Sequence, residues 1–261
     1  TIFHRPEEGF TLQIGDGQEI ANATGIMTIN DFRSEDVSKG GQGAPLVPIG
    51  DRHLFAEFPI CLNIGGIANV SYEMNGRRVA YDICMANQLL NYLANKLGYD
   101  YDNNGQFAKQ GKVDKELFDI LNDNAYYKQD APKSLGREFF ENVQHKIIDE
   151  SSLSINDLLA TATEHIAHQI VKSTDNLEKS KMLVTGGGAK NNFLIERICS
   201  LSKHEIVIPD VMITDFKEAL IFAFLGVLKM EGKINVLSSV TGASSDSSSG
   251  KTYQVELKVE N

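Results

Sequence analysis

The sequence has no long hydrophobic run and few cysteines, and each shortage excludes a class of protein. No window of its 261 residues approaches the roughly 18 consecutive apolar residues of a transmembrane helix, so no membrane span is predicted. The three cysteines lie at positions 61, 84 and 199 without a C-x-x-C pair, a pattern that favours reduced, cytoplasmic thiols over a disulfide framework. The chain also opens on Thr1 without a Met or a charged leader, and we therefore expect it to be cut from something longer.

The sequence has fewer basic than acidic residues. The sequence carries 25 Lys and Arg against 35 Asp and Glu, which gives a formal net charge of −10. Binding to nucleic-acid phosphates needs a surplus of Lys and Arg, so no nucleic-acid partner is predicted. The balance is compatible with a small-molecule enzyme that meets an anionic ligand with local amides and a metal ion. At roughly 150 residues per domain, the length suggests one large domain or two smaller ones.

Periodic apolar residues interrupted by turn signals predict an α/β or α+β protein. Between residues 10 and 31 short apolar stretches alternate with Gly and Asn, which predicts strands joined by tight turns. Residues 60–84 predict a hairpin that reverses at Asn75-Gly76. Further predicted helices cover 88–97, 112–121, 136–148, 155–171, 192–201 and 216–230, and further strands cover 181–185 and 205–208. Ser154 is the expected N-cap of helix 155–171. Helix 216–230 is apolar on so many sides that it should be buried between two layers or domains.

Two motif-like stretches fail the spacing tests for their chemistry. Ser249-Gly250-Lys251-Thr252 resembles the end of a P-loop, but the glycine needed five residues before Gly250 is Ser245. In Glu164-His165-Ile166-Ala167-His168 the histidines are three apart with the Glu outside, whereas zinc-protease helices place them four apart around the Glu. We interpret this second stretch as a solvated helix face, and we predict no metal-ligating residues.

Two glycine turns follow predicted strands and are candidates for phosphate or nucleotide binding. Gly186-Gly187-Gly188 joins strand 181–185 to helix 192–201, and Gly65-Gly66 lies at the bend of a hairpin. Glycine allows a ligand to approach bare backbone, and a helix N-terminus presents unpaired N–H groups. Taken alone, each turn is equally compatible with an ordinary connection or bulge in a sheet.

Asp82 is the candidate for the chemistry itself. The sequence places it at the end of the returning strand of the hairpin, near the Gly65-Gly66 turn. A carboxylate in that position suits a general base or a ligand of metal-bound water. A turn-capping Asp is the alternative that the pattern leaves open.

Together these features resemble the superfamily of actin, heat-shock ATPases and sugar kinases, in which two RNase H-like lobes clasp ATP. Within it, the sequence looks like the anhydro-N-acetylmuramic acid kinase family. The stretches that carry the resemblance are T-I-F-H-R-P at 1–6, Q-I-G-D-G at 13–17, D-F-R-S-E-D at 31–36, G-G-Q-G-A-P-L-V-P at 40–48, L-N-I-G-G-I-A-N at 62–69, P-K-S-L-G-R-E at 132–138 and V-T-G-A-S-S-D at 240–246. They follow the family's order nearly from end to end.

The resemblance implies an enzyme of cell-wall sugar recycling with ATP and Mg²⁺ as cofactors. Such a kinase opens 1,6-anhydro-N-acetylmuramic acid with water and phosphorylates the freed six-oxygen. The resemblance makes Asp82 the base that activates the water. The residues implied in nucleotide binding are Gly65, Gly66, Gly186, Gly187, Gly188 and Asn191. Those implied on the sugar-binding side are His4, Arg33, Asp36, Gln42, Asn87 and Glu218, together with the loop at 40–45.

The implied fold is α/β, with RNase H-like lobes of the actin and sugar-kinase type, one complete and one partial. We expect residues 1–57 to be the remnant of the first, sugar-binding lobe and residues 58–235 to form the nucleotide-binding lobe. The tail at 236–261 is expected to return to the first lobe. The implied partner is a small anhydro amino sugar, and the family commonly forms homodimers.

Two departures from the family pattern bear on activity. The family usually reads D-T-G-P-x-N from the base onward, whereas this sequence reads D-I-C-M-A-N at 82–87. The family's opening phosphate hairpin, G-x-M-S-G-T-S-x-D-G, has no match here, so we expect a truncated chain that is inactive or nearly so by itself. The alternative is a degenerate, non-catalytic member that binds a sugar or a nucleotide.

Overall fold

The computed structural model describes residues 3–256, which form two compact units. Within this range unit 1 comprises residues 3–55, Met74–Arg78 and residues 218–256, and unit 2 comprises Ala56–Glu73 and Val79–Lys217. The divisions at 55/56 and 217/218 differ from the expected 57/58 and 235/236. The second differs because residues 218–230 pack within unit 1, where the rings of Phe222 and Phe32 meet edge to face at 6.2 Å. Within the described range, no helix is long and apolar enough to cross a membrane.

Unit 2 is built on a five-stranded mixed sheet in the order β6-β5-β4-β7-β8. Its strands are β4 Ile60–Ile64, β5 Ile67–Met74, β6 Arg77–Met85, β7 Lys181–Thr185 and β8 Glu205–Val207. β4 pairs with β5 antiparallel (Asn63 opposite Asn69) and with β7 parallel (Asn63 opposite Thr185). The side chains of β4 and β7 are buried on both faces, as is usual for strands with helices on either side. A three-strand meander followed by parallel crossovers is the order of an RNase H-like lobe, so the α/β prediction is confirmed.

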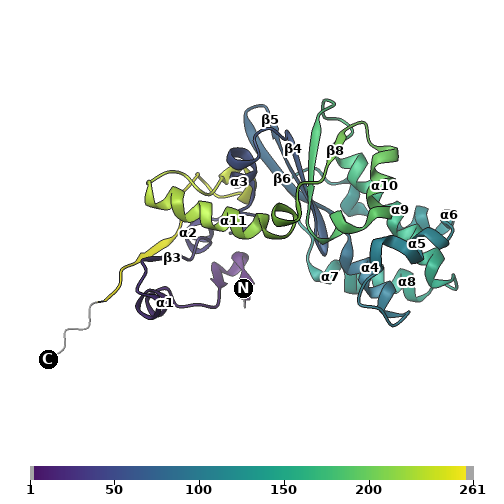
Figure 1. The fold of residues 1–261 in the computed structure, drawn as a ribbon, viewed down its shortest axis with the longest axis horizontal. Coiled ribbons are helices and arrows are strands. Elements are labelled where there is room, and N and C mark those ends of the chain that lie inside the picture. The colour runs from purple at the N-terminus through teal and green to yellow at the C-terminus, as the bar shows by residue number, and fades with distance from the viewer. Residues whose placement is uncertain (1–2, 257–261) are drawn as a thin grey trace. The chain divides into compact units, whose positions relative to one another are not determined.

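The helices of unit 2 pack around α9, Ile155–Thr174, which contacts α4, α5, α6 and α10 (Figure 1). The remaining helical segments are α4 Asn87–Asn95, η2 Asn103–Gly105, α5 Gln106–Gln110, α6 Lys115–Asn122, η3 Ala125–Lys128, α7 Arg137–Phe139, the π-helix η4 Phe140–Gln144, α8 His145–Asp149, η5 Gly187–Lys190 and α10 Asn192–Leu201. The Ser154 cap of α9 is confirmed, because its Oγ accepts from the N–H of Asp157 at 3.2 Å. The predicted helix at 112–121 begins three residues later, as α6, because the Asp114 side chain accepts from the N–H of Leu117 and caps the helix there.

Unit 1 holds two two-stranded sheets within the described range, β1-β2 and β3-β9. Its elements are β1 Phe3–Arg5, η1 Pro6–Glu8, β2 Phe10–Leu12, α1 Gly17–Thr24, β3 Thr28–Asn30, α2 Ser34–Ser38, α3 Pro48–Leu54, the second half of α11 Val211–Met230, α12 Ser238–Thr241 and β9 Lys251–Tyr253. β9 pairs antiparallel with β3, with Ile29 opposite Thr252. This pairing joins the C-terminal tail to the N-terminal part of unit 1.

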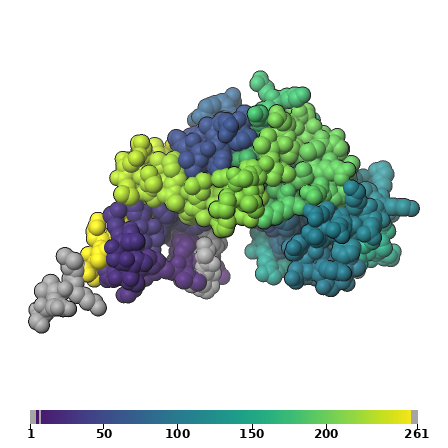
Figure 2. Space-filling model, viewed as in Figure 1, coloured from purple at the N-terminus to yellow at the C-terminus, as the bar shows by residue number. Residues whose placement is uncertain are grey.

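Two elements differ from the sequence prediction. Residues 10–31 contain a helix, α1, as well as strands, because Asp16 accepts hydrogen bonds from the N–H groups of Gln18 and Glu19 and so caps its first turn. Helix α11 begins at residue 211 instead of 216 and is not buried on all sides. Leu220, Val227 and Met230 are 43%, 48% and 65% exposed, and the yellow-green second half of α11 lies on the visible surface in Figure 2.

Candidate active site

The glycine turn after β7 lies against the end of β4, directly before the Gly65-Gly66 turn. A Cβ added to Gly186 would fall 2.7 Å from Asn63 Oδ1 and 2.8 Å from the carbonyl oxygen of Ile64. One added to Gly188 would fall 2.2 Å from Ile64 Cγ2. Gly186 also has a φ of +85°, which side chains rarely adopt. Glycine is therefore required where the turn after β7 meets the end of β4.

The Gly65-Gly66 turn is bonded to the start of α4. Its carbonyl groups accept from the N–H groups of Ala86 (2.8 Å), Asn87 (3.0 Å) and Gln88 (3.2 Å). The Asn87 side chain adds a bond from Nδ2 to the carbonyl of Ile64 at 3.1 Å. The first amides of α4 are thus used by the turn itself, and Asn87 ties the helix to β4.

The adenosine-turn candidates lead into η5 and α10. Asn191 is the N-cap of α10, and its Oδ1 accepts from the N–H of Leu194 at 3.1 Å. The first N–H groups of a short helix such as η5 have no carbonyl partner inside the helix, and these belong to Gly187 and Gly188. This end of the turn can donate to an anionic or polar ligand, whereas the Asn191 side chain has a structural role.

Asp82 is half-buried on β6, and main-chain bonds hold it from two sides. Its N–H donates to the carbonyl of Lys133 at 3.2 Å, and its carbonyl accepts from the Tyr126 hydroxyl at 2.6 Å. Its carboxylate oxygen Oδ2 accepts from the N–H of Leu135 at 2.9 Å. The strand continues past Asp82 to Met85, so the prediction that Asp82 ends the strand is wrong. A strand rises about 3.3 Å per residue, which puts Asp82 roughly 10 Å before the end of β6.

The surroundings of Asp82 raise its proton affinity. Burial raises the pKa of its carboxyl group, and the Leu135 hydrogen bond only partly offsets this by lowering it. Burial, and then the charge of Asp82, raises the pKa of the Cys84 thiol and of the Tyr126 hydroxyl. Both neighbours therefore stay neutral near pH 7. A half-buried carboxylate with a raised pKa is suited to accept a proton.

In unit 1 the glycine loop at 40–45 is held by Asp36, which is fully buried. Its two carboxylate oxygens accept from the Thr241 hydroxyl at 2.7 Å and from the N–H of Gly43 at 2.8 Å. The N–H of Gln42 donates to the Thr241 carbonyl at 2.8 Å, and the Gln42 side chain is exposed. The motifs at 31–36, 40–48 and 240–246 thus meet at one point. Asp36 shapes the loop, and a direct contact with a sugar stays a prediction.

Arg33 and Glu218 also lie within unit 1. The Arg33 guanidinium donates to the carbonyl of Gly43 at 2.7 Å and lies 5.6 Å from the centre of the Phe222 ring. Burial lowers the pKa of Arg33, and the charge of Glu218 opposes this shift. Glu218 is exposed and sits inside α11 instead of opening it. His4 lies in β1 opposite Thr11, and its side chain falls outside the described part of the chain.

A buried polar network in unit 2 corrects the prediction of a solvated face at 164–168. His165 is 0% exposed, and its Nδ1 lies 2.9 Å from Asn122 Oδ1 while its Nε2 lies 3.3 Å from the Tyr127 hydroxyl. Glu164 is part-buried and forms a two-bond ion pair with Arg197 at 2.7 and 3.0 Å. The sequence signal was the position of His165 among the apolar residues of the 155–171 stripe, which the motif comparison overlooked. Across the described residues, no group of three or more His, Cys, Asp or Glu could hold a metal ion.

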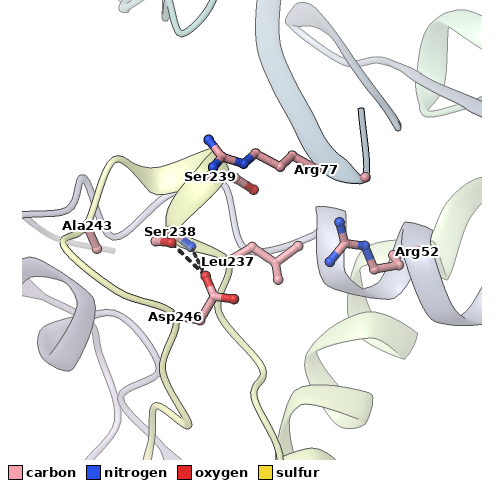
Figure 3. Close-up of a pocket in the computed structure, with 8 residues that line it drawn as sticks. Arg52, Arg77, Leu237, Ser238, Ser239, Ala243 and Asp246 are labelled. Carbon is pink, nitrogen blue, oxygen red and sulfur yellow. Dashed lines mark hydrogen bonds between the residues drawn. The ribbon is translucent and has the colours of Figure 1, made fainter. Parts of the chain in front are cut away.

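A polar cavity of about 420 Å³ in unit 1 lies among residues outside the predicted site (Figure 3). Arg52 and Arg77 line it together with Ser238 and Asp246. The Asp246 carboxylate accepts from the N–H and the hydroxyl of Ser238, both at 2.7 Å. The Asp246 carboxylate therefore already accepts hydrogen bonds from Ser238, the first residue of α12.

The strand order of unit 2, with glycine turns after β4 and β7 and an acid on β6, is that of a lobe of the actin and sugar-kinase class. Residues 1–255 match the model of the family described as "Anhydro-N-acetylmuramic acid kinase". The chain belongs to this family of phosphotransferases, as the motif resemblance predicted.

Two curated relatives illustrate the match. An anhydro-N-acetylmuramic acid kinase of Vibrio cholerae serotype O1 is 39% identical over 268 residues, covering 97% of this chain and 72% of the relative. One from Actinobacillus pleuropneumoniae serotype 7 is 37% identical over 268 residues, covering 97% of this chain and 73% of the relative. A solved structure, the activator of the 2-hydroxyisocaproyl-CoA dehydratase from Clostridium difficile with bound ADPNP, has 18% identity and a TM-score of 0.42 over 67% of this chain and 61% of that one. This last likeness is too distant to add to the fold assignment.

Proposed function

We propose that this kinase couples hydrolytic opening of 1,6-anhydro-N-acetylmuramic acid to phosphorylation of its O6, with Asp82 as the general base. The observation that carries the proposal is the state of Asp82. It is half-buried, fixed by the N–H of Leu135 at 2.9 Å, and its carboxyl pKa is raised by burial. Family membership supplies the substrate class, since the matched relatives are named for this sugar.

In the proposed reaction Asp82 accepts a proton from water while the water oxygen attacks C1 of the sugar. The bond from C1 to O6 breaks, and O6 takes the γ-phosphoryl group of ATP, which leaves ADP and the 6-phosphate. Asp82 then returns its proton to solvent. Water, C1, O6 and the phosphoryl group must lie in a row, so the base has to stand apart from the phosphate turn. The roughly 10 Å of β6 beyond Asp82 suits this spacing.

The glycine turns are the proposed nucleotide site. Gly65 and Gly66 would face the phosphates, and Gly186 to Gly188 the adenosine. Mg²⁺ in kinases is usually held by one or two carboxylates plus the substrate phosphates, which fits a chain whose described residues offer no metal-binding cluster of their own. When bound with ATP, Mg²⁺ would neutralise phosphate charge. The proposed sugar contacts stay Gln42, Glu218, Arg33, Asn87 and His4, with Asp36 acting through the glycine loop.

A cytoplasmic location and a homodimer belong to the same proposal. The reaction draws on ATP, and the three cysteines of the chain are free thiols, two buried and one exposed. Size-exclusion chromatography with light scattering measures the oligomeric state directly.

One observation favours the alternative of a non-catalytic binding member. The stretch after Asp82 lacks the family's glycine and proline, and in their place stand Cys84 and Met85, both 0% exposed. These two residues continue strand β6, so the backbone here is extended and packed. If the changed shape prevents the sugar from reaching Asp82, the chain would bind ligand without turning it over.

The deciding experiment measures ADP release and sugar-phosphate formation with the anhydro sugar and Mg-ATP. Asp82→Asn should lower kcat by about 10²- to 10⁴-fold, which is the usual contribution of a general base. Asp123→Asn is the matched control, because Asp123 is exposed and its carboxylate pairs with Lys128 at 2.7 Å. Unchanged turnover in Asp82→Asn would remove Asp82 as the base. Calorimetric binding of the sugar or an ATP analogue without any turnover would refute catalysis by this chain alone and is the result expected of the binding member.

A further inference from the structure

The segment that carries Lys133 and Leu135 is fastened to β6 beside Asp82. The carbonyl of Lys133 accepts from the N–H of Asp82 at 3.2 Å, and the N–H of Leu135 donates to Asp82 Oδ2 at 2.9 Å. These two bonds lie two residues apart on the same stretch. The position of the Asp82 carboxylate therefore depends on how firmly residues 133–135 are held.

The Lys133 side chain supplies that hold. Its ammonium lies 4.9 Å from the centre of the Tyr126 ring and 5.5 Å from that of Tyr81, both within the range of a cation–π contact. It also donates to the carbonyl of Tyr126 at 3.3 Å. An ammonium between two ring faces and a carbonyl is fixed from three directions. Pro132 and Ser134 on either side of Lys133 are exposed, whereas Leu135 is buried.

Both rings are anchored independently of Lys133. The Tyr81 hydroxyl donates to the carbonyl of Ser173 on α9 at 3.0 Å, and its ring meets that of Tyr72 edge to face at 6.2 Å. The Tyr126 hydroxyl donates to the carbonyl of Asp82 at 2.6 Å. The two rings are therefore held by contacts with other parts of unit 2, and the Lys133 ammonium packs between them.

We propose that Lys133 is a positioning residue for the reaction: seated between Tyr81 and Tyr126, it holds residues 133–135 on β6 so that the Leu135 N–H fixes the Asp82 carboxylate. The catalytic significance rests on the proposed function, in which Asp82 is the base. This seating of Lys133 between Tyr81 and Tyr126, which holds residues 133–135 on β6, is called the clamp below. It is a property of the fold and can be tested without turnover. Residues 132–138 carry the family motif P-K-S-L-G-R-E. The proposal assigns a role to two residues of this motif, Lys133 and Leu135.

The charged and titratable groups around the clamp define what a variant changes. Asp82 faces Cys84 on its own strand and Tyr126 from η3, and both stay neutral because their pKa values are raised. Burial lowers the pKa of Lys133, with Asp130 opposing this and Lys172 adding to it. The Leu135 N–H lowers the pKa of Asp82. Releasing residues 133–135 should therefore raise the pKa of Asp82 further.

The experiment follows Asp82 by NMR in protein labelled at the aspartate carboxyl carbons and at the amide nitrogens. In the parent chain the Leu135 amide resonance should titrate together with the Asp82 carboxyl. Lys133→Met keeps the alkyl chain and removes the ammonium, so the Leu135 response should be lost and the pKa of Asp82 should rise. Lys133→Arg retains a cation for the two rings and should restore both. Lys128→Met, which removes an exposed lysine at the end of η3, should change neither.

Kinetics then link the clamp to the reaction. Lys133→Met should lower kcat/KM by about 10- to 100-fold, as expected for a misplaced catalytic group, and move the acidic limb of its pH profile upward. The loss must stay smaller than that of Asp82→Asn. An unchanged Leu135 amide and Asp82 pKa in folded Lys133→Met would overturn the clamp. A lost amide response without any change in the kinetic pH profile would keep the clamp and instead refute Asp82 as the base.

Discussion

The buried imidazole of His165 should make the stability of unit 2 depend on pH in a way that one substitution removes. Asn122 Oδ1 can only accept, so the ring must carry its hydrogen on Nδ1, and Nε2 then accepts from the Tyr127 hydroxyl. The same Asn122 oxygen accepts from Gln169 Nε2 at 2.6 Å, and the Tyr127 oxygen accepts from Gln144 Nε2 at 3.3 Å. Every partner in this network is matched to a neutral ring, and a second proton on Nε2 would remove the acceptor of the Tyr127 hydroxyl.

The magnitude follows from the pKa of the ring. Burial, with a smaller contribution from the charge of His168, lowers the pKa of His165 to about 3, whereas an unfolded histidine titrates near 6.5. Between these two values the unfolded chain binds a proton that the folded chain does not, so the free energy of unfolding rises with pH across this window. One pH unit corresponds to about 1.4 kcal/mol. Lowering the pH from about 6.5 to about 5 should therefore remove roughly 2 kcal/mol.

Urea unfolding of the parent chain and of His165→Asn, followed by far-ultraviolet circular dichroism at about pH 7 and pH 5, measures this contribution. The variant should be less stable at the higher pH, because the Tyr127 hydroxyl loses its acceptor, but it should lose roughly 2 kcal/mol less on acidification. His168→Asn is the control on the same helix. His168 is only half-buried, and although burial lowers its pKa too, most of the acid sensitivity should persist. Parallel pH dependence in the parent chain and His165→Asn would refute the neutral buried ring.

Two further substitutions test the turns. Gly186→Ala adds a Cβ 2.7 Å from Asn63 Oδ1 at a φ of +85°, and it should cost about 1–3 kcal/mol and weaken binding of an ATP analogue. Gly98→Ala has a similar φ of +83° but no atom within 4 Å, so equal binding losses in both variants would contradict the crowding at Gly186. Thr241→Val removes the 2.7 Å bond to the buried Asp36 carboxylate and should cost about 1.5–3 kcal/mol in urea unfolding. A loss below a few tenths of a kcal/mol would show that Asp36 does not depend on this partner.

The regular elements of unit 2 were predictable because local signals and tertiary packing agree there. Strand 181–185 and helix 192–201 have the predicted bounds, since apolar period, glycine turn and cap all point to one structure. Helix α1 was missed because its Gly and Asn content suggested turns, although Asp16 was present as a cap. The surroundings of Asp82 could not be read from the sequence, because Leu135 and Tyr126 reach it across 53 and 44 residues. His165 is a different case, since its place in the apolar stripe of 155–171 indicates burial, and only its partners Asn122 and Tyr127 depend on the fold.

Because the Gly65-Gly66 turn is bonded to the start of α4, the length of the backbone between them and Asp82 fixes the distance from the acid to the turn. Because the turn is bonded to the amides of Ala86, Asn87 and Gln88, the stretch of backbone from residue 82 to residue 86 sets the separation of acid and turn. Side-chain substitutions within this stretch leave the separation intact. Inserting or deleting one residue would shift Asp82 by about 3.3 Å and turn it to the opposite face of the sheet. The altered residues after Asp82 keep the family's residue count up to Asn87, and so they keep the distance between Asp82 and the turn while changing the side chains in between.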